Sequence, residues 1–153
     1  MKKYVYFSLM LIWMIVIFCF SSASADISGG QSMSLTEKLL DIIGINLTTD
    51  GINALENVIR KIAHFTEYFV LGVLAMLYVS SVTSCKKAWL FAFVLCVIYA
   101  CSDEIHQHFV PGRACRLFDI CIDSCGSFLA IYLTKLIRIK LNLSSNKIMR
   151  NNY

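Results

Sequence analysis

The stretch AWLFAFVLCVIYACSDEIHQHFVPGR, from Ala88 to Arg113, joins a long apolar run directly to a cluster of charged residues. Two carboxylates and two imidazoles stand at the exit of the run, and a Pro-Gly-Arg turn follows them. Ionisable groups at the end of an apolar segment are costly to place near lipid, and in membrane proteins they mark functional sites by default. We therefore interpret this stretch as a membrane-spanning helix that carries a candidate site at its end.

The composition places the whole chain in the class of helical membrane proteins. The hydrophobic fraction is 58% and only 16% of the residues are charged, which lies outside the range of soluble domains. The apolar residues come in blocks, and the basic residues lie in short clusters between the blocks. This pattern orients membrane helices, so the net charge of +4 does not indicate a nucleic-acid partner.

The seven cysteines do not indicate a disulfide framework or a metal site. None of them belongs to a C-x-x-C pair, and most lie inside apolar blocks, where a free thiol behaves as a small hydrophobic side chain.

Four apolar segments are long enough to cross a membrane. They cover Tyr4 to Phe20, Ile62 to Val82, the run that starts at Ala88, and Leu117 to Leu136. The first segment has an alternative interpretation as a signal peptide, because Ala23-Ser24-Ala25 resembles a signal-peptidase site. Its apolar core is longer than the roughly 7 to 15 residues of most signal peptides, so we expect it to remain as the first transmembrane helix.

The connection after the first span is expected to form short amphipathic helices. Ser34-Leu35-Thr36-Glu37 matches a capping box, and Gly44 is a stop signal for the helix that this box would open. Asp50 can cap a second helix that runs on into the second span. We expect both helices to lie along the membrane surface or over the bundle.

The chain therefore divides into four parts along its length. We predict a first transmembrane helix (1–25), an extracytoplasmic connection (26–60), a three-helix membrane core (61–136) and a cytoplasmic basic tail (137–153).

The distribution of basic residues predicts the orientation of the bundle. With the N-terminus inside, nine of the fourteen Lys and Arg residues fall on the inner side. They are Lys2, Lys3, Lys86, Lys87, Lys135, Arg138, Lys140, Lys147 and Arg150. We therefore expect a multi-pass protein of the cell membrane with both termini in the cytoplasm and the charged end of the third span facing outward.

Acidic side chains recur on three separate spans at about the same depth. His64 and Glu67 have the spacing of one helix face on the second span, and Asp119 and Asp123 have it on the fourth. The helical rise places Glu67 and Asp103 near the outer edge of the apolar layer. We predict that the three spans converge on one polar pocket.

Small residues continue the face that carries the two acids of the fourth span. Gly126 and Ala130 follow Asp119 and Asp123 at helical spacing. Small residues let helix backbones approach closely in membranes, so this face is expected to pack against a neighbouring span.

Three kinds of function remain open from these residues. Glu67, Asp103 and Glu104 are candidates for general acid or base catalysis, because carboxylates partly removed from water bind protons more readily. No nucleophile with a positioned base stands out. The chain can thus be an enzyme acting on a lipid or an envelope precursor, a binding protein, or a structural protein whose acids only hold the bundle together.

Metal binding and anion binding are two further possibilities for the polar residues. His64 and Glu67 can reach one ion, and His106 and His108 supply further imidazoles. No H-E-x-x-H is present and the basic residues nearly balance the acids, so we expect no metal or other cofactor. Arg113 can hold a phosphate or carboxylate by two hydrogen bonds, or can form a salt bridge with Asp119.

The polar motifs resemble those of the VanZ-like membrane proteins. They are RKIAHFTEY from Arg60 to Tyr68, DEIHQHFVPGR from Asp103 to Arg113, and Asp119 followed by Gly126. The resemblance implies a small bacterial integral membrane protein. Because the family takes its name from a member linked to teicoplanin resistance, the resemblance also implies a role at the cell envelope and in glycopeptide susceptibility.

The resemblance further implies a set of polar positions. They are His64, Glu67, Tyr68, Asp103, Glu104, Gln107, Arg113, Asp119 and Gly126. Asp123 replaces the asparagine that is usual in the family, and it can donate a hydrogen bond to a ligand only when it is protonated. With Asp123 included, we expect the polar residues of this set to bind a membrane lipid or a cell-envelope molecule.

Overall fold

A computed structural model describes residues 1–45 and 47–151, and within these residues the chain is helical with no strand. The helices are α1 (Lys2–Ser21), α2 (Ala25–Ile43), α3 (Thr49–Val82), α4 (Ala88–His108) and α5 (Leu117–Asn151). Four of them, α1, α3, α4 and the part of α5 up to Leu141, are long and apolar enough to cross a membrane. The predicted all-α membrane fold with four transmembrane helices is confirmed.

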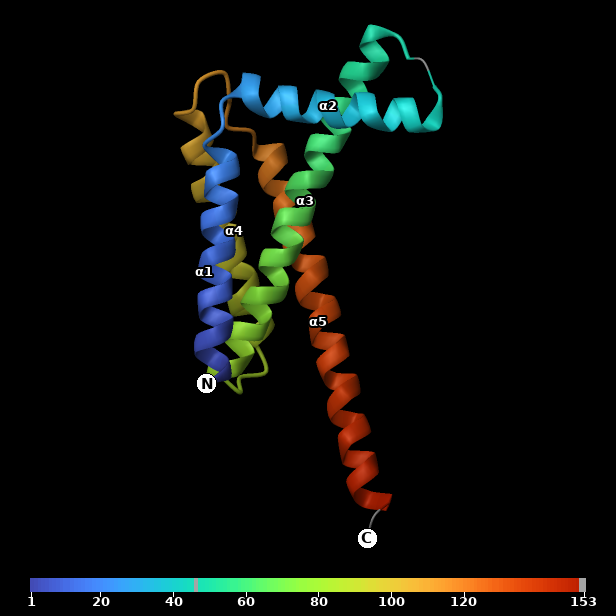
Figure 1. Cartoon of the computed structure of the whole chain (residues 1–153). Helices are drawn as coiled ribbons and strands as arrows, with labels where there is room; N and C mark the ends of the chain where they lie inside the picture. The colour runs from blue at the N-terminus through green and yellow to red at the C-terminus, as the bar shows by residue number, and fades with distance from the viewer. Residues whose placement is uncertain (46, 152–153) are drawn as a thin grey trace.

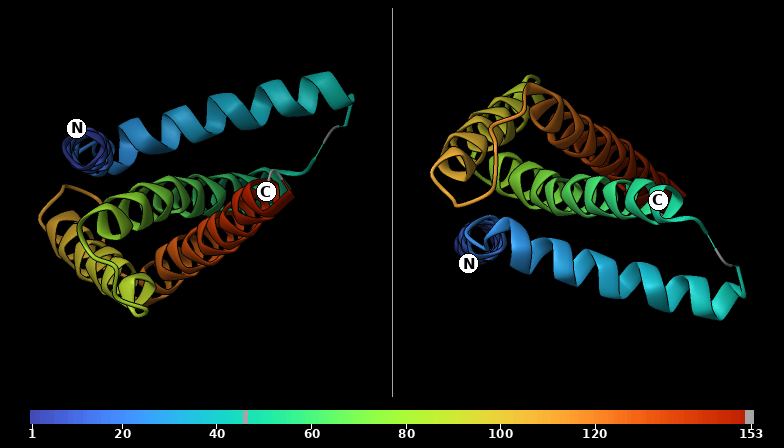
Figure 2. Two further views of the ribbon diagram at one scale, coloured as in Figure 1. Left: turned by 90° about the horizontal axis from the view of Figure 1, so that it is seen from below. Right: turned by 90° about the horizontal axis from the view of Figure 1, so that it is seen from above.

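The four spanning helices run up and down, so that the start of α1 and the last part of α5 lie toward the same end of the bundle, where α5 extends beyond the other helices (Figure 1). The turn between α3 and α4 lies at that same end, whereas α2 and the loop of residues 109–116 lie at the opposite end (Figure 1). Seen along the bundle, α3 lies between α1 and α2 on one side and α4 and α5 on the other (Figure 2). The end that carries α2 and the 109–116 loop is called the α2 end below.

Helix α2 begins earlier than the capping box predicted. Ser24 is its N-cap and accepts a hydrogen bond from the Ile27 amide at 3.5 Å. The Thr36 hydroxyl donates to the Ser32 carbonyl oxygen at 2.8 Å, so Thr36 lies inside the helix rather than at its start. The predicted start at Ser34 is wrong, whereas the predicted stop at Gly44 is confirmed by its left-handed φ of 72°.

Helix α3 is one continuous helix of 34 residues. Thr48 caps it by accepting a hydrogen bond from the Gly51 amide at 3.4 Å, so the cap lies two residues before the predicted one at Asp50. At about 1.5 Å per residue such a helix is about 51 Å long, which exceeds an apolar layer of about 30 Å. The first part of α3 therefore projects beyond the other spans at the α2 end, as Figure 1 shows.

The closest helix contact in the bundle joins α3 and α5. A methyl group on Gly72 would come within 2.6 Å of the Ser127 carbonyl oxygen, and one on Gly126 would overlap the Phe65 carbonyl oxygen. Ala130 is fully buried at the same contact. The prediction that Gly126 and Ala130 pack against a neighbouring span is confirmed, and Gly72 provides the matching surface on α3.

Helix α1 is fastened to the bundle by side chains along its length. Ile17 is fully buried, and the Trp13 indole donates a hydrogen bond to the Glu67 carbonyl oxygen at 2.9 Å. On the other side, the Tyr99 hydroxyl donates to the Met14 carbonyl oxygen at 2.6 Å. These contacts place the end of α1 beside the polar ends of α3 and α4.

Candidate functional site

A buried hydrogen-bond network joins α1 to α4 at the α2 end. The Ser21 hydroxyl donates to Asp103 Oδ2 at 2.8 Å, and Gln107 Nε2 donates to the same oxygen at 3.0 Å. Gln107 Nε2 also lies 3.3 Å from the Ser21 hydroxyl oxygen. Asp103 is only 3% exposed. Its Oδ2 atom accepts hydrogen bonds both from α1 and from its own helix, α4.

The neighbouring acid, Glu104, has a different partner. Its Oε2 atom accepts a hydrogen bond from the Arg116 backbone amide at 2.8 Å, and the side chain is fully buried. This contact fixes the loop just before the start of α5. The two adjacent acids of the motif thus fasten α4 to α1 and to the loop, respectively.

The acids of α5 face cationic or imidazole groups of α3. Asp119 Oδ1 lies 3.5 Å from Lys61 Nζ, and the fully buried Asp123 has its Oδ1 atom 3.8 Å from His64 Nδ1. The latter distance is too long for a good hydrogen bond. Within the described residues, neither His64 Nδ1 nor the two Asp123 oxygens have a hydrogen-bond partner.

Arg113 does not form the salt bridge to Asp119 that was one of its two predicted roles. Its Nη2 atom instead donates to the Phe20 carbonyl oxygen at 3.4 Å, which ties the 109–116 loop to the end of α1. Burial, followed by the nearby Arg60 guanidinium, lowers the pKa of Arg113 from its usual range. An arginine nevertheless stays charged, so two positive side chains are held close together.

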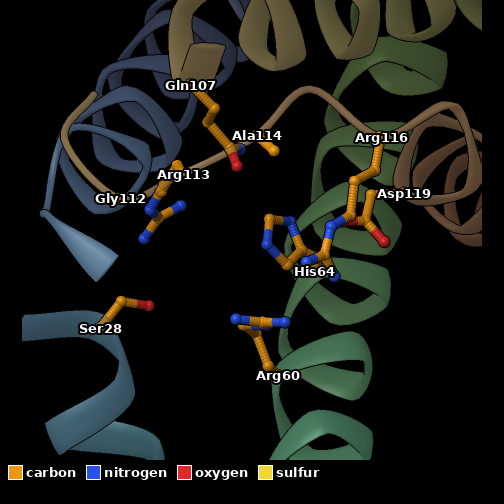
Figure 3. Close-up of a pocket in the computed structure, with 9 residues that line it drawn as sticks. All are labelled: Ser28, Arg60, His64, Gln107, Gly112, Arg113, Ala114, Arg116 and Asp119. Atoms are coloured by element: carbon orange, nitrogen blue, oxygen red, sulfur yellow. The ribbon is translucent and has the colours of Figure 1, made fainter. Parts of the chain in front are cut away.

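A polar cavity of about 80 Å³ lies between these groups. It is lined by Ser28, Arg60, His64, Gln107, Gly112, Arg113, Ala114, Arg116 and Asp119 (Figure 3). The lining comes from α2, α3, the end of α4, the loop and the start of α5. The cavity therefore unites all three predicted motifs with α2.

A larger cavity of about 280 Å³ adjoins the first one. The two share Ser28, Arg60, His64 and Arg113 as lining residues. Glu67 lines only the larger cavity. Of the predicted polar residues, His64, Glu67, Gln107, Arg113 and Asp119 line one or both cavities.

The remaining predicted residues lie outside the cavity linings. Tyr68, Asp103, Glu104 and Asp123 are almost fully buried. Among the described side chains, the Tyr68 hydroxyl, Asp103 Oδ1 and Glu104 Oε1 have no hydrogen-bond partner. Such atoms are rare in folded proteins, because an unpaired buried polar group costs about 1–3 kcal/mol.

The imidazoles of α4 are not part of this arrangement. His106 stacks on Phe18, with 4.5 Å between the ring centroids, and its Nε2 atom lies 3.1 Å from the Ser22 hydroxyl. His108 is exposed and lies against Phe109. Among the described residues, no group of three or more His, Cys, Asp or Glu side chains is arranged to hold a metal ion.

Four residues of the site were not among the predicted ligand-binding residues. Ser21 belongs to the Asp103 network, and Ser28, Arg60 and Arg116 line the smaller cavity. Arg60 had a usable signal, because it lies one helical turn before His64 and thus on the same face. The two serines had none, because each meets the site from a different helix.

The fold and the polar residues at the α2 end define a multi-pass helical membrane protein with a cluster of acidic, basic and imidazole side chains at that end of its bundle. A comparison with protein-family models shows which group this is. The VanZ/LLP1 model matches residues 6–138, and the chain belongs to the VanZ/LLP1 family. No curated protein and no solved structure matches the chain in the same kind of comparison.

Proposed function

We propose that this protein binds a lipid head group or another cell-envelope molecule in the polar cavities at the α2 end. We further propose that it acts from the cell membrane and lowers susceptibility to lipid-tailed glycopeptides of the teicoplanin type. The observation that carries the proposal is the convergence of polar side chains from several parts of the chain on these cavities, among them His64, whose buried Nδ1 atom has no hydrogen-bond partner within the described residues. A network that served only to hold helices together would be expected to satisfy its own polar atoms.

The orientation of the cavities is part of the proposal. The turn with Lys86 and Lys87 lies at the end opposite to α2, as does the start of α1 with Lys2 and Lys3. Loops rich in Lys and Arg stay in the cytoplasm, so the α2 end faces the outside. A ligand from the outer leaflet or the cell wall then has direct access to the cavities.

The experiment compares the purified parent chain with the double variant Glu67→Gln/Asp103→Asn. Mass spectrometry of co-purified molecules is expected to find a lipid or envelope molecule with the parent and to find less of it with the variant. The control is Asp41→Asn, which neutralises an exposed acid near the far end of α2. Equal amounts of the same molecule in all three preparations would contradict the proposal.

The effect on susceptibility is measured in cells. A host that produces the parent chain is expected to tolerate more teicoplanin-type glycopeptide than a host with an empty vector or with the double variant at equal membrane abundance. Equal tolerance of the three hosts would remove the glycopeptide part of the proposal.

A structural role is the second candidate, and one observation favours it. The Ser21, Asp103 and Gln107 network connects α1 to α4 within the described chain. If this connection is the only purpose of Asp103, removal of its charge should lower stability and any activity together. The unfolding stability of Asp103→Asn in detergent separates the two candidates.

A further inference from the structure

Three guanidinium groups reach the smaller cavity from different parts of the chain. Arg60 comes from α3, whereas Arg113 and Arg116 come from the 109–116 loop, Arg116 being its last residue before α5. Figure 3 shows Arg60 and Arg113 extending from different sides toward the same space, with Ser28 of α2 beside it. No carboxylate whose side chain the structure describes lies within 4.0 Å of a nitrogen atom of these three side chains.

Three acids near the cavity have partners other than the three arginine side chains. Asp103 accepts hydrogen bonds from the Ser21 and Gln107 side chains. Glu104 accepts one from the Arg116 backbone amide, and Asp119 pairs with Lys61. The arginines therefore have neutral partners in the described chain, namely Asn57 Oδ1 for Arg60 and the Phe20 carbonyl oxygen for Arg113.

Positive groups that are partly removed from water repel one another unless an anion lies between them. Burial and the proximity of Arg60 lower the pKa of Arg113, which is the expected effect of such crowding. Guanidinium groups bind oxyanions through paired hydrogen bonds. Donors that approach from several directions suit a tetrahedral phosphate better than a planar carboxylate.

The larger cavity supplies a place for the rest of an amphiphile. It shares Arg60 and Arg113 with the smaller one, but it is also lined by apolar side chains. These are Phe20, Leu35, Ile59 and Ala63, from α1, α2 and α3. A molecule with a phosphate group in the smaller cavity would thus meet apolar surface directly beside it.

We infer that the cavities bind a phosphate-bearing lipid, with its phosphate between Arg60 and Arg113 and its apolar part in the larger cavity beneath α2. This inference rests on the proposed function, because it names the chemical class of the ligand for the same site. It assigns binding roles to Arg60, Arg116 and Ser28, and it predicts that the apolar portion contributes to affinity.

The test uses the purified full chain in a neutral maltoside detergent and three probes. The probes are short-chain phosphatidic acid, inorganic phosphate and the matching short-chain diacylglycerol, and binding is measured by isothermal titration calorimetry. Phosphatidic acid is expected to bind at least about tenfold more tightly than inorganic phosphate, because its chains bury apolar surface. Saturable binding is not expected for the diacylglycerol.

Substitution of the arginines tests the phosphate position. Arg60→Gln and Arg113→Gln are each expected to weaken phosphatidic acid binding by about tenfold or more, since a charge-assisted contact is lost. Arg138→Gln removes an arginine from α5 outside both cavity linings and is expected to leave affinity unchanged. If a Gln variant does not fold, the Arg→Lys variant at the same position should keep the charge and lose part of the affinity.

Substitution of Ala63 tests the apolar part. Ala63 lines only the larger cavity and is exposed, so Ala63→Phe can fill that cavity without rebuilding the core. The variant is expected to weaken phosphatidic acid binding and to leave inorganic phosphate binding unchanged.

Two results would overturn the inference. The first is unchanged phosphatidic acid binding in folded Arg60→Gln and Arg113→Gln variants. The second is equal affinity for phosphatidic acid and inorganic phosphate, which would assign the site to free phosphate. If either result occurs while a neutral envelope molecule still co-purifies with the parent chain, the proposed function stands. Only the inference that the ligand carries a phosphate is then rejected.

Discussion

The Ser21 hydroxyl donates a 2.8 Å hydrogen bond to the Asp103 carboxylate and so links two residues that are 82 positions apart in the chain. Gln107 donates to the same Asp103 oxygen, so Oδ2 is satisfied from two sides. The other oxygen, Oδ1, has no hydrogen-bond partner within the described residues. The carboxylate therefore links α1 to α4 through one oxygen atom, and the described contacts give no role to the other.

Replacement of Asp103 by Asn tests whether the charge has a role beyond this link. The amide oxygen can still accept from Ser21 and Gln107, so we expect Asp103→Asn to reach near-normal membrane abundance and to unfold in detergent within about 1 kcal/mol of the parent. Ligand retention should fall, because a neutral amide oxygen holds Gln107, which lines the smaller cavity, less firmly than a carboxylate does. A loss of about 3–5 kcal/mol, the usual cost of breaking a buried ionic network, would instead assign Asp103 to bracing alone.

Substitution of Glu67 distinguishes a binding role from a structural role more clearly, because the structural contact of Glu67 uses its backbone. The Trp13 indole donates to the Glu67 carbonyl oxygen, which a side-chain substitution leaves in place. The Glu67 side chain lines the larger cavity. We expect Glu67→Gln to keep the melting temperature of the parent and to lose co-purified ligand, as measured by thermal unfolding in detergent and by mass spectrometry. A fall in both quantities together would argue against a binding role.

The contact between α3 and α5 is expected to tolerate no added volume. In Gly126→Ala the new methyl group would overlap the Phe65 carbonyl oxygen, and a backbone atom cannot rotate away. We expect a loss of about 1–3 kcal/mol in thermal or denaturant unfolding in detergent.

Gly30→Ala is the matched control for this substitution. A methyl group on Gly30 would meet no atom within 4 Å, and Gly30 lies inside α2. Alanine favours a helix interior over glycine by about 0.5–1 kcal/mol, so this variant should be as stable as the parent or slightly more stable. Equal destabilisation of the two variants would show that the close α3–α5 contact is not the cause.

The orientation of the bundle can be measured by cysteine labelling in intact cells. In a background in which the other native cysteines are replaced by alanine, a single cysteine is placed at exposed Ser34 of α2 or kept at exposed Cys85 between α3 and α4. A membrane-impermeant maleimide is expected to label the Ser34→Cys protein at once and Cys85 only after permeabilisation. The reverse pattern would place the cavities on the cytoplasmic side.

The membrane fold could be predicted from the sequence because hydropathy and charge repeat along the chain itself. The start of α2 could not. Gly29 and Gly30 each disfavour a helix by about 1 kcal/mol relative to alanine. The Ser34–Glu37 stretch, in contrast, matches the sequence pattern of a capping box. In the structure Ser24 caps the helix instead, and packing of α2 over α3 outweighs the cost of the two glycines.

The site could be predicted in part, because polar residues at the ends of apolar spans can be recognised in the sequence. His64, Gln107, Arg113 and Asp119 carry polar groups at the ends of apolar spans, and all four line the smaller cavity. The pairing of residues on different helices has no signature in the spacing of a single sequence. The choice of Lys61 rather than Arg113 as the partner of Asp119 therefore had to come from the structure.

The close contact between α3 and α5 at Gly72 and Gly126 also bears on the order in which the helices assemble. Gly72 is synthesised 54 residues before Gly126, and at about 5–20 residues per second the ribosome needs about 3–11 s to cover this interval. During that delay α1, α3 and α4 can already meet through Trp13 and Ser21, while the surface of α3 around Gly72 stays open to lipid. Insertion of α5 would then displace that lipid and act as the closing step of biogenesis.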